Sequence, residues 1–495
     1  MAPKINSFYQ MKKRPTILIL GPKSASASWQ EAIDLIRQGV TPWNHQQDMI
    51  DYLLGNIGAL FSEVGTGKSL SCLFAARANT GEIEFYDLSY GPAVKRAKKY
   101  QKALIDRAND PTKVRIIYIN HESAWRKHLA DLISKTDFST IIVDEAHALK
   151  SAGSKLSQWA SRFQKTHPNA KRIAATGTPC PDSPFCLYGI YRFLDSSILG
   201  TNFRKFQRIL APFEKQYMGQ RSFEVQAKDK NGVRLWDSAG IAWIQKIVSK
   251  NSICVRIDDC LDMPDEVFHN VRFELTAAEQ KFYKQMKRDA VADLENDEQA
   301  FSANALAKTL KLKQAASGIV RMPDGTDRLI DVAGASKRKA FKEFVGSLQK
   351  ENDLYGEEPI VVFYEYNAEL AEIAETAKDE GRLFFQLNGH KNQMEEWKQA
   401  GKGMLAVQIK AGGAGVNLQN ARIAVFYSMT WSAGDYTQCK GRIRRPNQKA
   451  SSVLYVHLIA RDTIDEGVYR ALKNKQRAVD AVVEGLKKDT AAAIS

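Results

Sequence analysis

The sequence lacks the features that mark membrane, secreted and zinc-binding proteins. No apolar run approaches the roughly 20 residues that a helix needs to cross a bilayer. The segment from Met1 to Arg14 is polar and basic, and the apolar run 17–20 is too short for the core of a signal peptide. Six cysteines occur, but none forms a Cys-x-x-Cys pair or accompanies a histidine cluster. We therefore expect a cytoplasmic protein with no membrane partner, whose thiols are reduced and hold no zinc.

Acidic residues are fewer than basic residues in this sequence. The 495 residues include 56 Asp and Glu against 71 Lys and Arg, which gives a formal net charge of +15. Such an excess favours a polyanionic partner such as DNA or RNA. Charge alone is weak evidence, because many basic proteins bind nothing acidic, and the motifs must decide.

Internal repeats and long low-complexity tracts are also absent, and the pattern along the chain is that of an α/β protein. Short apolar, β-branched runs alternate with helical patterns, which predicts βαβ units and parallel sheets. Each half of the chain predicts one doubly wound lobe. The expected strands are 16–20, 58–61, 82–86, 115–119, 140–143 and 172–175 in the first half, and 359–364, 383–387, 404–409, 422–427 and 453–459 in the second.

The organisation predicts five segments. They are an N-terminal extension with a strand, turn and helix (1–40), a first lobe (41–198), a mainly helical connector (199–335), a second lobe (336–472) and a basic C-terminal helix or tail (473–495). The connector carries basic side chains that either face nucleic acid or line a solvated helix: Lys281, Lys284, Lys287 and Arg288.

A phosphate-binding loop is predicted between an expected strand and an expected helix, in the run Ser62-Glu63-Val64-Gly65-Thr66-Gly67-Lys68-Ser69. Its glycines allow backbone N–H groups to surround phosphate oxygens. Lys68 would reach the β- and γ-phosphates of ATP, and the Ser69 hydroxyl would bind Mg²⁺. Ser62 stands where the general pattern has a glycine, so a chance loop is the alternative.

An acidic box, Asp144-Glu145-Ala146-His147, directly follows the expected strand 140–143. Asp144 at a strand end can hold Mg²⁺ through water, and Glu145 can act as the general base for the attacking water. His147 would sense the γ-phosphate and couple it to the next lobe. An acidic surface turn is the alternative.

Two further segments follow strands. The turn Thr176-Gly177-Thr178-Pro179 presents two hydroxyls on a stiff backbone, where Thr176 and Thr178 would take part in coupling. The glycine-rich run 411–418 allows a close approach of the backbone to a ligand, although a plain strand-to-helix turn explains it as well.

Two arginines complete the constellation. Arg442 and Arg445 are three residues apart, so on a helix they would share one face. Guanidinium groups placed in this way can clamp a triphosphate bound on another lobe, as arginine fingers do. A basic helix that binds a phosphate backbone is the alternative.

Taken together, these motifs resemble superfamily 2 helicases and, within them, Swi/Snf-type ATPases, including compact phage and bacterial branch-migration helicases. The resemblance runs from about Pro42 to about Arg470. Further segments that carry it are 42–46, 120–123, 144–150, 361–363, Trp431 and 438–448.

The resemblance implies two RecA-like lobes, ATP and Mg²⁺ as cofactors, and site residues beyond those named above. Gln46 would read adenine, and Gly65, Thr66, Gly67, Gly415 and Gln438 would line the ATP site. His121, Lys410 and Gly412 would contact DNA.

The chain also departs from the family. No clear motif Ia follows the phosphate loop, where 91–95 is only a candidate. A better match, Gly21-Pro22-Lys23-Ser24 with Trp29, precedes the loop and is therefore in the wrong order. Pro446-Asn447 replaces a small aliphatic residue and a glycine, which affects the local turn.

The expected function is ATP hydrolysis coupled to movement along duplex or branched DNA, with branch migration or fork remodelling as its use. Three alternatives remain: an RNA helicase, a non-catalytic nucleotide-gated DNA-binding subunit, and the motor subunit of a larger restriction or defence complex. Lys68, Asp144, Glu145 and the two arginines argue against the non-catalytic alternative.

Overall fold

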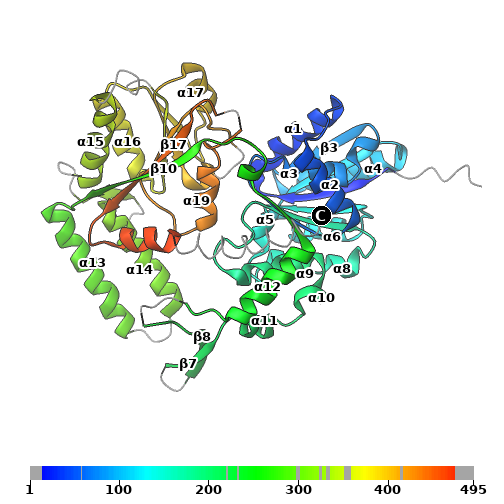
Figure 1. Ribbon diagram of the computed structural model, residues 1–495, viewed down its shortest axis with the longest axis horizontal. Coiled ribbons are helices and arrows are strands. Elements are labelled where there is room, and N and C mark those ends of the chain that lie inside the picture. Colours follow the sequence, from blue (N-terminus) through cyan, green and yellow to red (C-terminus); the bar gives the residue numbers. More distant parts are fainter. Residues whose placement is uncertain are drawn as a thin grey trace, which may run out of the picture. The chain divides into compact units, whose positions relative to one another are not determined.

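The computed structural model describes residues 14–56, 58–218, 221–230, 234–296, 301–322, 326–330, 335–350, 358–412, 416–446 and 448–473. The chain forms two compact units (Figure 1). Unit 1 contains the chain up to Pro212 together with Gln226–Cys260, and unit 2 contains Phe213–Val225 and the chain from Leu261 to Asp480. None of the described helices is both long and apolar enough to span a membrane.

Unit 1 is built on a parallel sheet of seven strands in the order β3-β4-β1-β5-β6-β2-β9. The central strands are mostly apolar and are buried along their whole length, as in sheets that are covered by helices on both faces. The strands are β1 (Thr16–Gly21), β2 (Ala59–Ser62), β3 (Ile83–Asp87), β4 (Val114–Asn120), β5 (Thr140–Asp144), β6 (Lys171–Thr176) and β9 (Ser252–Val255).

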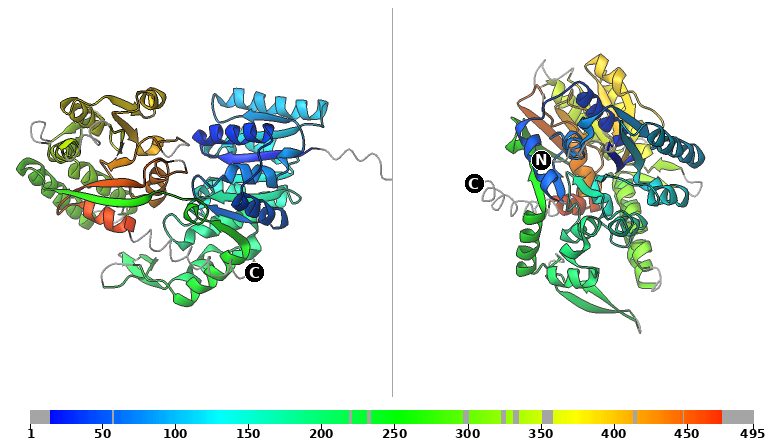
Figure 2. Two further views of the ribbon diagram at one scale, coloured as in Figure 1. Left: turned by 45° about the horizontal axis from the view of Figure 1, so that its top comes forward. Right: turned by 90° about the vertical axis from the view of Figure 1, so that its right-hand side faces the viewer.

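Helices lie above and below this sheet (Figure 2). Those around the phosphate loop share one apolar core, in which Trp29, Ile33, Leu53 and Leu73 are fully buried. The helices are α1 (Ser26–Arg37), α2 (Asn44–Gly55), α3 (Lys68–Ala75), α4 (Ala93–Asn109), α5 (His121–Ala124), α6 (Lys127–Ser134), α7 (Lys155–Ala160), α8 (Phe163–Thr166), α9 (Leu187–Leu194), α10 (Ser196–Leu199), α11 (Phe203–Leu210) and α12 (Ser238–Asn251).

The described part of the N-terminal segment is not an extension but the middle of the unit 1 sheet. Strand β1 pairs on one side with β4 and on the other with β5. The boundary expected at residue 40 therefore separates no structural units. The sequence pattern gives strand and helix correctly here but contains no information on the place of the strand in the sheet.

Unit 2 is a second parallel sheet, in the order β10-β17-β16-β13-β15-β14, with apolar cores on its two faces. Its strands are β10 (Asp265–Phe273), β13 (Ile360–Tyr364), β14 (Phe384–Leu387), β15 (Met404–Gln408), β16 (Ile423–Phe426) and β17 (Ser452–Ala460). Its helices are α15 (Ser336–Lys350), α16 (Asn367–Asp379), α17 (Met394–Ala400), α18 (Ile409–Gly412) and α19 (Ala433–Lys440). The predicted fold class of two doubly wound α/β lobes is thus confirmed, and every expected strand is present with ends shifted by at most one residue.

The expected connector is mainly helical but supplies one strand to each sheet, β9 to unit 1 and β10 to unit 2. Its other elements are α13 (Ala277–Asn296), α14 (Phe301–Ala316) and two antiparallel pairs, β7 (Phe213–Met218) with β8 (Arg221–Gln226) and β11 (Ile319–Arg321) with β12 (Asp327–Leu329).

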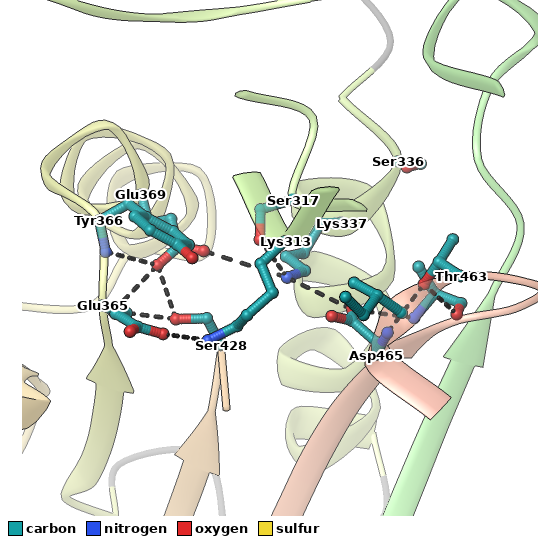
Figure 3. A network of polar contacts seen from close by, with 12 residues as sticks. Lys313, Ser317, Ser336, Lys337, Glu365, Tyr366, Glu369, Ser428, Thr463 and Asp465 are labelled. Atoms are coloured by element: carbon teal, nitrogen blue, oxygen red, sulfur yellow. Dashed lines mark hydrogen bonds and ion pairs between the residues drawn. The ribbon is translucent and has the colours of Figure 1, made fainter. Parts of the chain in front are cut away.

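A polar network fixes α14 to the strand ends of unit 2 (Figure 3). The Lys313 ammonium on α14 donates to the Glu365 carboxylate at 2.5 Å, directly after β13. The buried Lys337 ammonium donates to Ser317 Oγ at 2.7 Å and lies 3.9 Å from an oxygen of Asp465. Buried charges of this kind need partners, so the network defines where the helical segment sits on unit 2.

Candidate functional site

The phosphate loop connects β2 to α3 in unit 1. Gly65 and Gly67 have φ values of 96° and 86°, a left-handed conformation that glycine adopts without steric cost. Helix α3 begins at Lys68, so the free N–H groups of its first turn lie at the loop. Such a helix start is suited to bind a phosphate group.

Polar contacts within the loop include the serine that replaces the usual glycine. Ser62 is fully buried, and its hydroxyl contacts that of Thr66, which in turn donates to Glu63 O at 2.8 Å. The Lys68 ammonium donates to Ser62 O at 2.7 Å and to Glu63 O at 2.9 Å. Ser62 therefore takes part in the hydrogen bonds that hold the loop, and the loop forms although a serine replaces the usual glycine.

Gln46 lies against this loop. Its Oε1 accepts a hydrogen bond from Trp43 N at the start of α2, and its Nε2 lies 3.4 Å from Thr66 O. The ring of His45 approaches the same carbonyl at 3.1 Å, and Trp43 is about half exposed beside it. The predicted role of Gln46 in reading adenine remains a prediction.

Asp144 is the last residue of β5, and its carboxylate is held on both oxygens. Trp29 Nε1 donates to Oδ2 at 2.9 Å, and Glu145 N donates to Oδ1 at 2.9 Å. Burial, followed by the nearby Glu145 charge, raises the pKa of Asp144 to about 6, while Trp29 and Lys68 act in the opposite direction.

Glu145 directly follows the strand in a left-handed conformation with φ of 46°. Non-glycine residues rarely adopt this conformation, and it is often found at functional sites. Thr176 Oγ1 lies 3.3 Å from Glu145 Oε2, and His147 Nδ1 lies 3.2 Å from the same oxygen. His147 Nδ1 is also 3.2 Å from the hydroxyls of Thr176 and Thr178. The acidic box and the Thr-Gly-Thr-Pro turn thus form one polar cluster.

The turn also reaches the phosphate loop. A Cβ atom placed on Gly177 would lie 3.3 Å from Ser62 O and 3.6 Å from Lys68 Nζ. The phosphate loop, the acidic box and this turn therefore meet where β2, β5 and β6 end. Ligands of parallel α/β sheets bind at this edge.

The donor set of this edge fits Mg²⁺. The ion prefers oxygen ligands and is bound by one or two carboxylates together with phosphate and water. Asp144 offers a buried carboxylate, and Ser69 offers a hydroxyl in the first turn of α3. No group of three or more His, Cys, Asp or Glu residues within the described ranges could form an all-protein metal cage.

In unit 2, the two arginines do not lie on a helix, so the prediction that they share a helix face is wrong. Helix α19 ends at Lys440, and Arg442 and Arg445 follow it in turns. Pro446 disfavours the helical conformation for Arg445, which helps to explain why no helix includes this residue. Arg442 is mostly buried, and its carbonyl accepts from Leu418 N at 2.9 Å.

Arg445 connects the arginine segment to the glycine-rich run. Its Nη2 lies 3.4 Å from Val416 O and its Nε 3.3 Å from Gly441 O. Gln438 is buried on α19. Gly415 lies outside the described residues. The two expected motifs of unit 2 are thus adjacent, while their roles toward ATP remain predictions.

Of the residues expected to contact DNA, Lys410 is exposed on the short helix α18, which ends at Gly412. His121 begins α5 at the end of β4. Burial, and then the neighbouring His147, lowers the pKa of His121 to about 4, so its ring is neutral near pH 7. Any contact it makes with a phosphate would lack a full positive charge.

Trp29 is a site residue that the sequence patterns did not indicate, although the segment that contains it stands out. Trp29 and Asp144 are 115 positions apart, and only the pairing of β1 with β5 brings them together. The signal in the sequence is the segment with Gly21 and Trp29, which resembles a family motif but precedes the phosphate loop.

Comparisons with known proteins show the family of this chain. The SNF2-related domain model matches residues 5–320, more than half of the chain. The chain belongs to the SNF2-related family. The helicase conserved C-terminal domain matches residues 338–447, which covers the glycine-rich and arginine segments of unit 2.

Three curated relatives of this SNF2-related protein are at most 28% identical to it. An uncharacterized ATP-dependent helicase of Mycoplasma pneumoniae is 22% identical over 88% of this chain and 42% of its own length. Putative protein p41 of Acyrthosiphon pisum secondary endosymbiont phage 1 is 28% identical over 76% of this chain and 78% of its own. The chicken DNA repair and recombination protein RAD54-like is 21% identical over 74% of this chain and 52% of its own. The chain thus spans less than half of the Mycoplasma relative.

Among solved structures, the Sulfolobus solfataricus SWI2/SNF2 ATPase core in complex with dsDNA is similar. It is 18% identical, with coverage of 90% of this chain and 94% of that one, and a TM-score of 0.35.

Proposed function

We propose that this SNF2-related protein hydrolyses ATP at the unit 1 site and uses the energy to move along duplex or branched DNA. The observation that carries the first half is the meeting of three segments at one sheet edge. Hydrogen bonds join Asp144 to Glu145 and Glu145 to Thr176. The Lys68 ammonium lies 3.6 Å from the position of a Cβ atom added to Gly177, the residue after Thr176.

In the proposed reaction, water attacks the γ-phosphorus of ATP, and the bond to the β–γ bridging oxygen breaks, which gives ADP and phosphate. The N–H groups of the loop and the Lys68 ammonium hold the phosphates. The Glu145 carboxylate accepts the proton of the attacking water. Ser69 and Asp144 would hold Mg²⁺, which when bound neutralises charge on the phosphate oxygens.

His147, Thr176 and Thr178 form the proposed coupling group. Their polar atoms share a cluster with Glu145, so a change at the γ-phosphate side alters the partners of the turn. Arg442 and Arg445 of unit 2 would stabilise the transition-state charge. A nucleotide cycle that changes the preferred arrangement of two lobes can then produce steps along a track.

Two substitutions test hydrolysis at this site. Lys68→Ala is expected to lose nucleotide affinity and turnover, because the ammonium group that binds the phosphates is removed. Glu145→Gln is expected to keep ATP binding and to lose hydrolysis, because an amide cannot accept the proton. ATP binding is measured by calorimetry, and phosphate release by a coupled assay. Near wild-type phosphate release by the purified Glu145→Gln protein would refute the assignment.

DNA as the partner is supported by an exposed basic stripe on α4. Lys95, Lys98 and Lys102 follow the spacing i, i+3 and i+7, which places them on one helix face. All three are exposed, and within the described residues none forms an ion pair. Lys23, two residues after the end of β1, lies over the exposed ring of Tyr90, which precedes this helix. A stripe of cations without acidic partners suits a phosphate backbone.

His121, Lys410 and Gly412 remain proposed further contacts, and an intact duplex remains the proposed track. Opening a base-pair step costs roughly 1.4 kcal/mol, whereas strand exchange at a junction re-forms the pairs that it breaks. A motor that follows the backbone would therefore migrate branches and leave long duplexes intact.

Gel assays with ATP distinguish the two modes. A synthetic four-way junction or fork is expected to be resolved, and a long partial duplex is expected to survive. Processive unwinding of the duplex, with the junction ignored, would indicate a strand-tracking helicase instead.

A further inference from the structure

The N-terminal strand and helix reach the centre of the proposed ATPase site through one side chain. Trp29 on α1 is fully buried, and its indole N–H donates to Oδ2 of Asp144 at 2.9 Å. Resting on the proposed function, we propose that Trp29 is a positioning residue for the metal-binding carboxylate of Asp144. The βα unit formed by β1 and α1 would thereby set the affinity of the site for Mg²⁺, although it precedes the phosphate loop in the sequence.

The sheet register places this unit beside the acidic box. Strand β1 runs parallel to β5, and Leu20 is the register partner of Val143, the residue before Asp144. The chain then turns at Gly21, where an added Cβ atom would lie 2.3 Å from the hydroxyl oxygen of Tyr118. That hydroxyl donates to Pro22 O at 2.6 Å, so the turn is held from β4 as well.

Helix α1 holds the indole in a fixed place. Trp29 packs in the same apolar core as Ile33 of α1 and Leu73 of α3, the helix that follows the phosphate loop. A fully buried, close-packed side chain has little rotational freedom. The N–H group therefore points at the carboxylate from a rigid support.

The Asp144 carboxylate has one protein donor on each oxygen, the indole on Oδ2 and Glu145 N on Oδ1. Two donors on opposite oxygens fix the rotation of the carboxylate plane. Each oxygen keeps a further lone pair for a water or a metal ion. Groups that orient a metal ligand in this way typically change metal affinity by about 10- to 100-fold when they are removed.

Packing alone does not require a tryptophan at this position. Phenylalanine would retain an aromatic ring in the core, but only tryptophan adds a donor to a buried carboxylate. A hydrogen bond to a charged group is stronger than one between neutral groups. The proposal therefore concerns the N–H group and not the ring.

The test is the Trp29→Phe variant of the full chain, with Trp397→Phe as its matched control. Trp397 is also buried, but within the described residues its Nε1 has no hydrogen-bond partner. ADP binding is measured by calorimetry across a Mg²⁺ titration and again in excess chelator. A second variant carries 3-benzothienylalanine at position 29, which keeps the bicyclic shape and replaces N–H by sulfur.

We expect both position-29 variants to bind Mg²⁺ in the presence of ADP about ten-fold more weakly than the wild type. ADP affinity in chelator should be unchanged, and Trp397→Phe should match the wild type in both measurements. Mg²⁺ affinity within two-fold of wild type in the benzothienyl variant would overturn the proposal. So would an equal loss of ADP affinity in chelator, which would indicate a distorted pocket. If ADP binding by the wild type does not depend on Mg²⁺, the proposed function fails instead.

Discussion

The side chain of Gln46 occupies the space beside Gly67, where an added Cβ atom would lie 2.2 Å from Nε2 of the glutamine. Gly67 is also the residue before α3 and has a φ of 86°. The start of α3, which carries Lys68, therefore requires a glycine at position 67. The Gln46 side chain fills the space that a side chain there would need.

The Gly67→Ala variant should bind ATP at least ten-fold more weakly. An alanine there must adopt a left-handed conformation and displace Gln46, a strain of about 1–3 kcal/mol at the phosphate loop. Gly39→Ala is the control, since Gly39 has a φ of 74° but no atom of a non-adjacent residue within 4 Å of its added Cβ. Equal ATP affinity in the two variants would show that the contact with Gln46 is unimportant. ATP binding is measured by calorimetry, and folding by thermal unfolding.

Removal of the Arg445 guanidinium should leave ATP affinity within a few-fold and reduce turnover by about 10³. The reason is that a finger arginine acts on the charge of the transition state. Arg445→Lys should recover only part of the rate, because lysine lacks the planar fork of donors. Lys449→Ala, an exposed cation four residues further on, is the control. Normal turnover with weakened DNA binding would place Arg445 on the nucleic acid.

The basic stripe on α4 predicts a specific decrease in the salt dependence of DNA binding. Replacing Lys98 and Lys102 by glutamine should reduce the slope of log K against log salt for duplex DNA by about 1.8, or roughly 0.9 for each phosphate that is no longer neutralised. The control is the same change at Lys135 and Lys165, which are exposed and precede β5 and β6. An unchanged slope in the α4 variant would remove this helix from the DNA-binding surface. Fluorescence anisotropy at several salt concentrations gives the slopes.

His457 predicts an acid-sensitive unit 2. The ring is fully buried on β17, 5.1 Å from the ring of Phe426, and burial, followed by the Lys440 charge, lowers its pKa to about 3. In the unfolded chain the histidine pKa is near 6.5, so the unfolded chain binds the proton more tightly than the folded one. The contribution of His457 to the free energy of unfolding is therefore fully present above pH 6.5 and is lost as the pH drops toward 3. Between pH 6.5 and 5 the loss is about 2 kcal/mol.

Thermal unfolding at pH 7.5 and pH 5 measures this effect. The His457→Phe variant should lose less stability than the wild type between the two values, while substitution of the exposed His390 by glutamine should change nothing. Identical pH dependence in His457→Phe and wild type would contradict a neutral, buried ring.

The sequence predicts the strands and the catalytic segments well, because both depend on local patterns. Apolar runs such as 140–143 followed by Asp-Glu indicate a buried strand and a strand-end site with no knowledge of the fold. The short β9 and the largely exposed β10 give weak apolar signals, so neither strand was predicted. The helix expected at Arg442 is absent, because the turn after Lys440 is fixed by contacts with Leu418 and Val416.

The order of strands in a sheet is the information that local patterns lack. The segment with Gly21 and Trp29 is recognisable from its residues, but nothing in the sequence places β1 between β4 and β5. The hydrogen bond from Trp29 to Asp144 follows only from that placement.

The central claim, ATP hydrolysis driven by a duplex track, is tested most directly by the rate of phosphate release with four nucleic acids compared side by side. These are duplex DNA, branched DNA, single-stranded DNA and RNA at equal nucleotide concentration, with Glu145→Gln as the blank. We predict that duplex and branched DNA raise the rate well above the level reached with single-stranded DNA or RNA. Stimulation by RNA or by single strands alone, with no response to duplex DNA, would contradict the account.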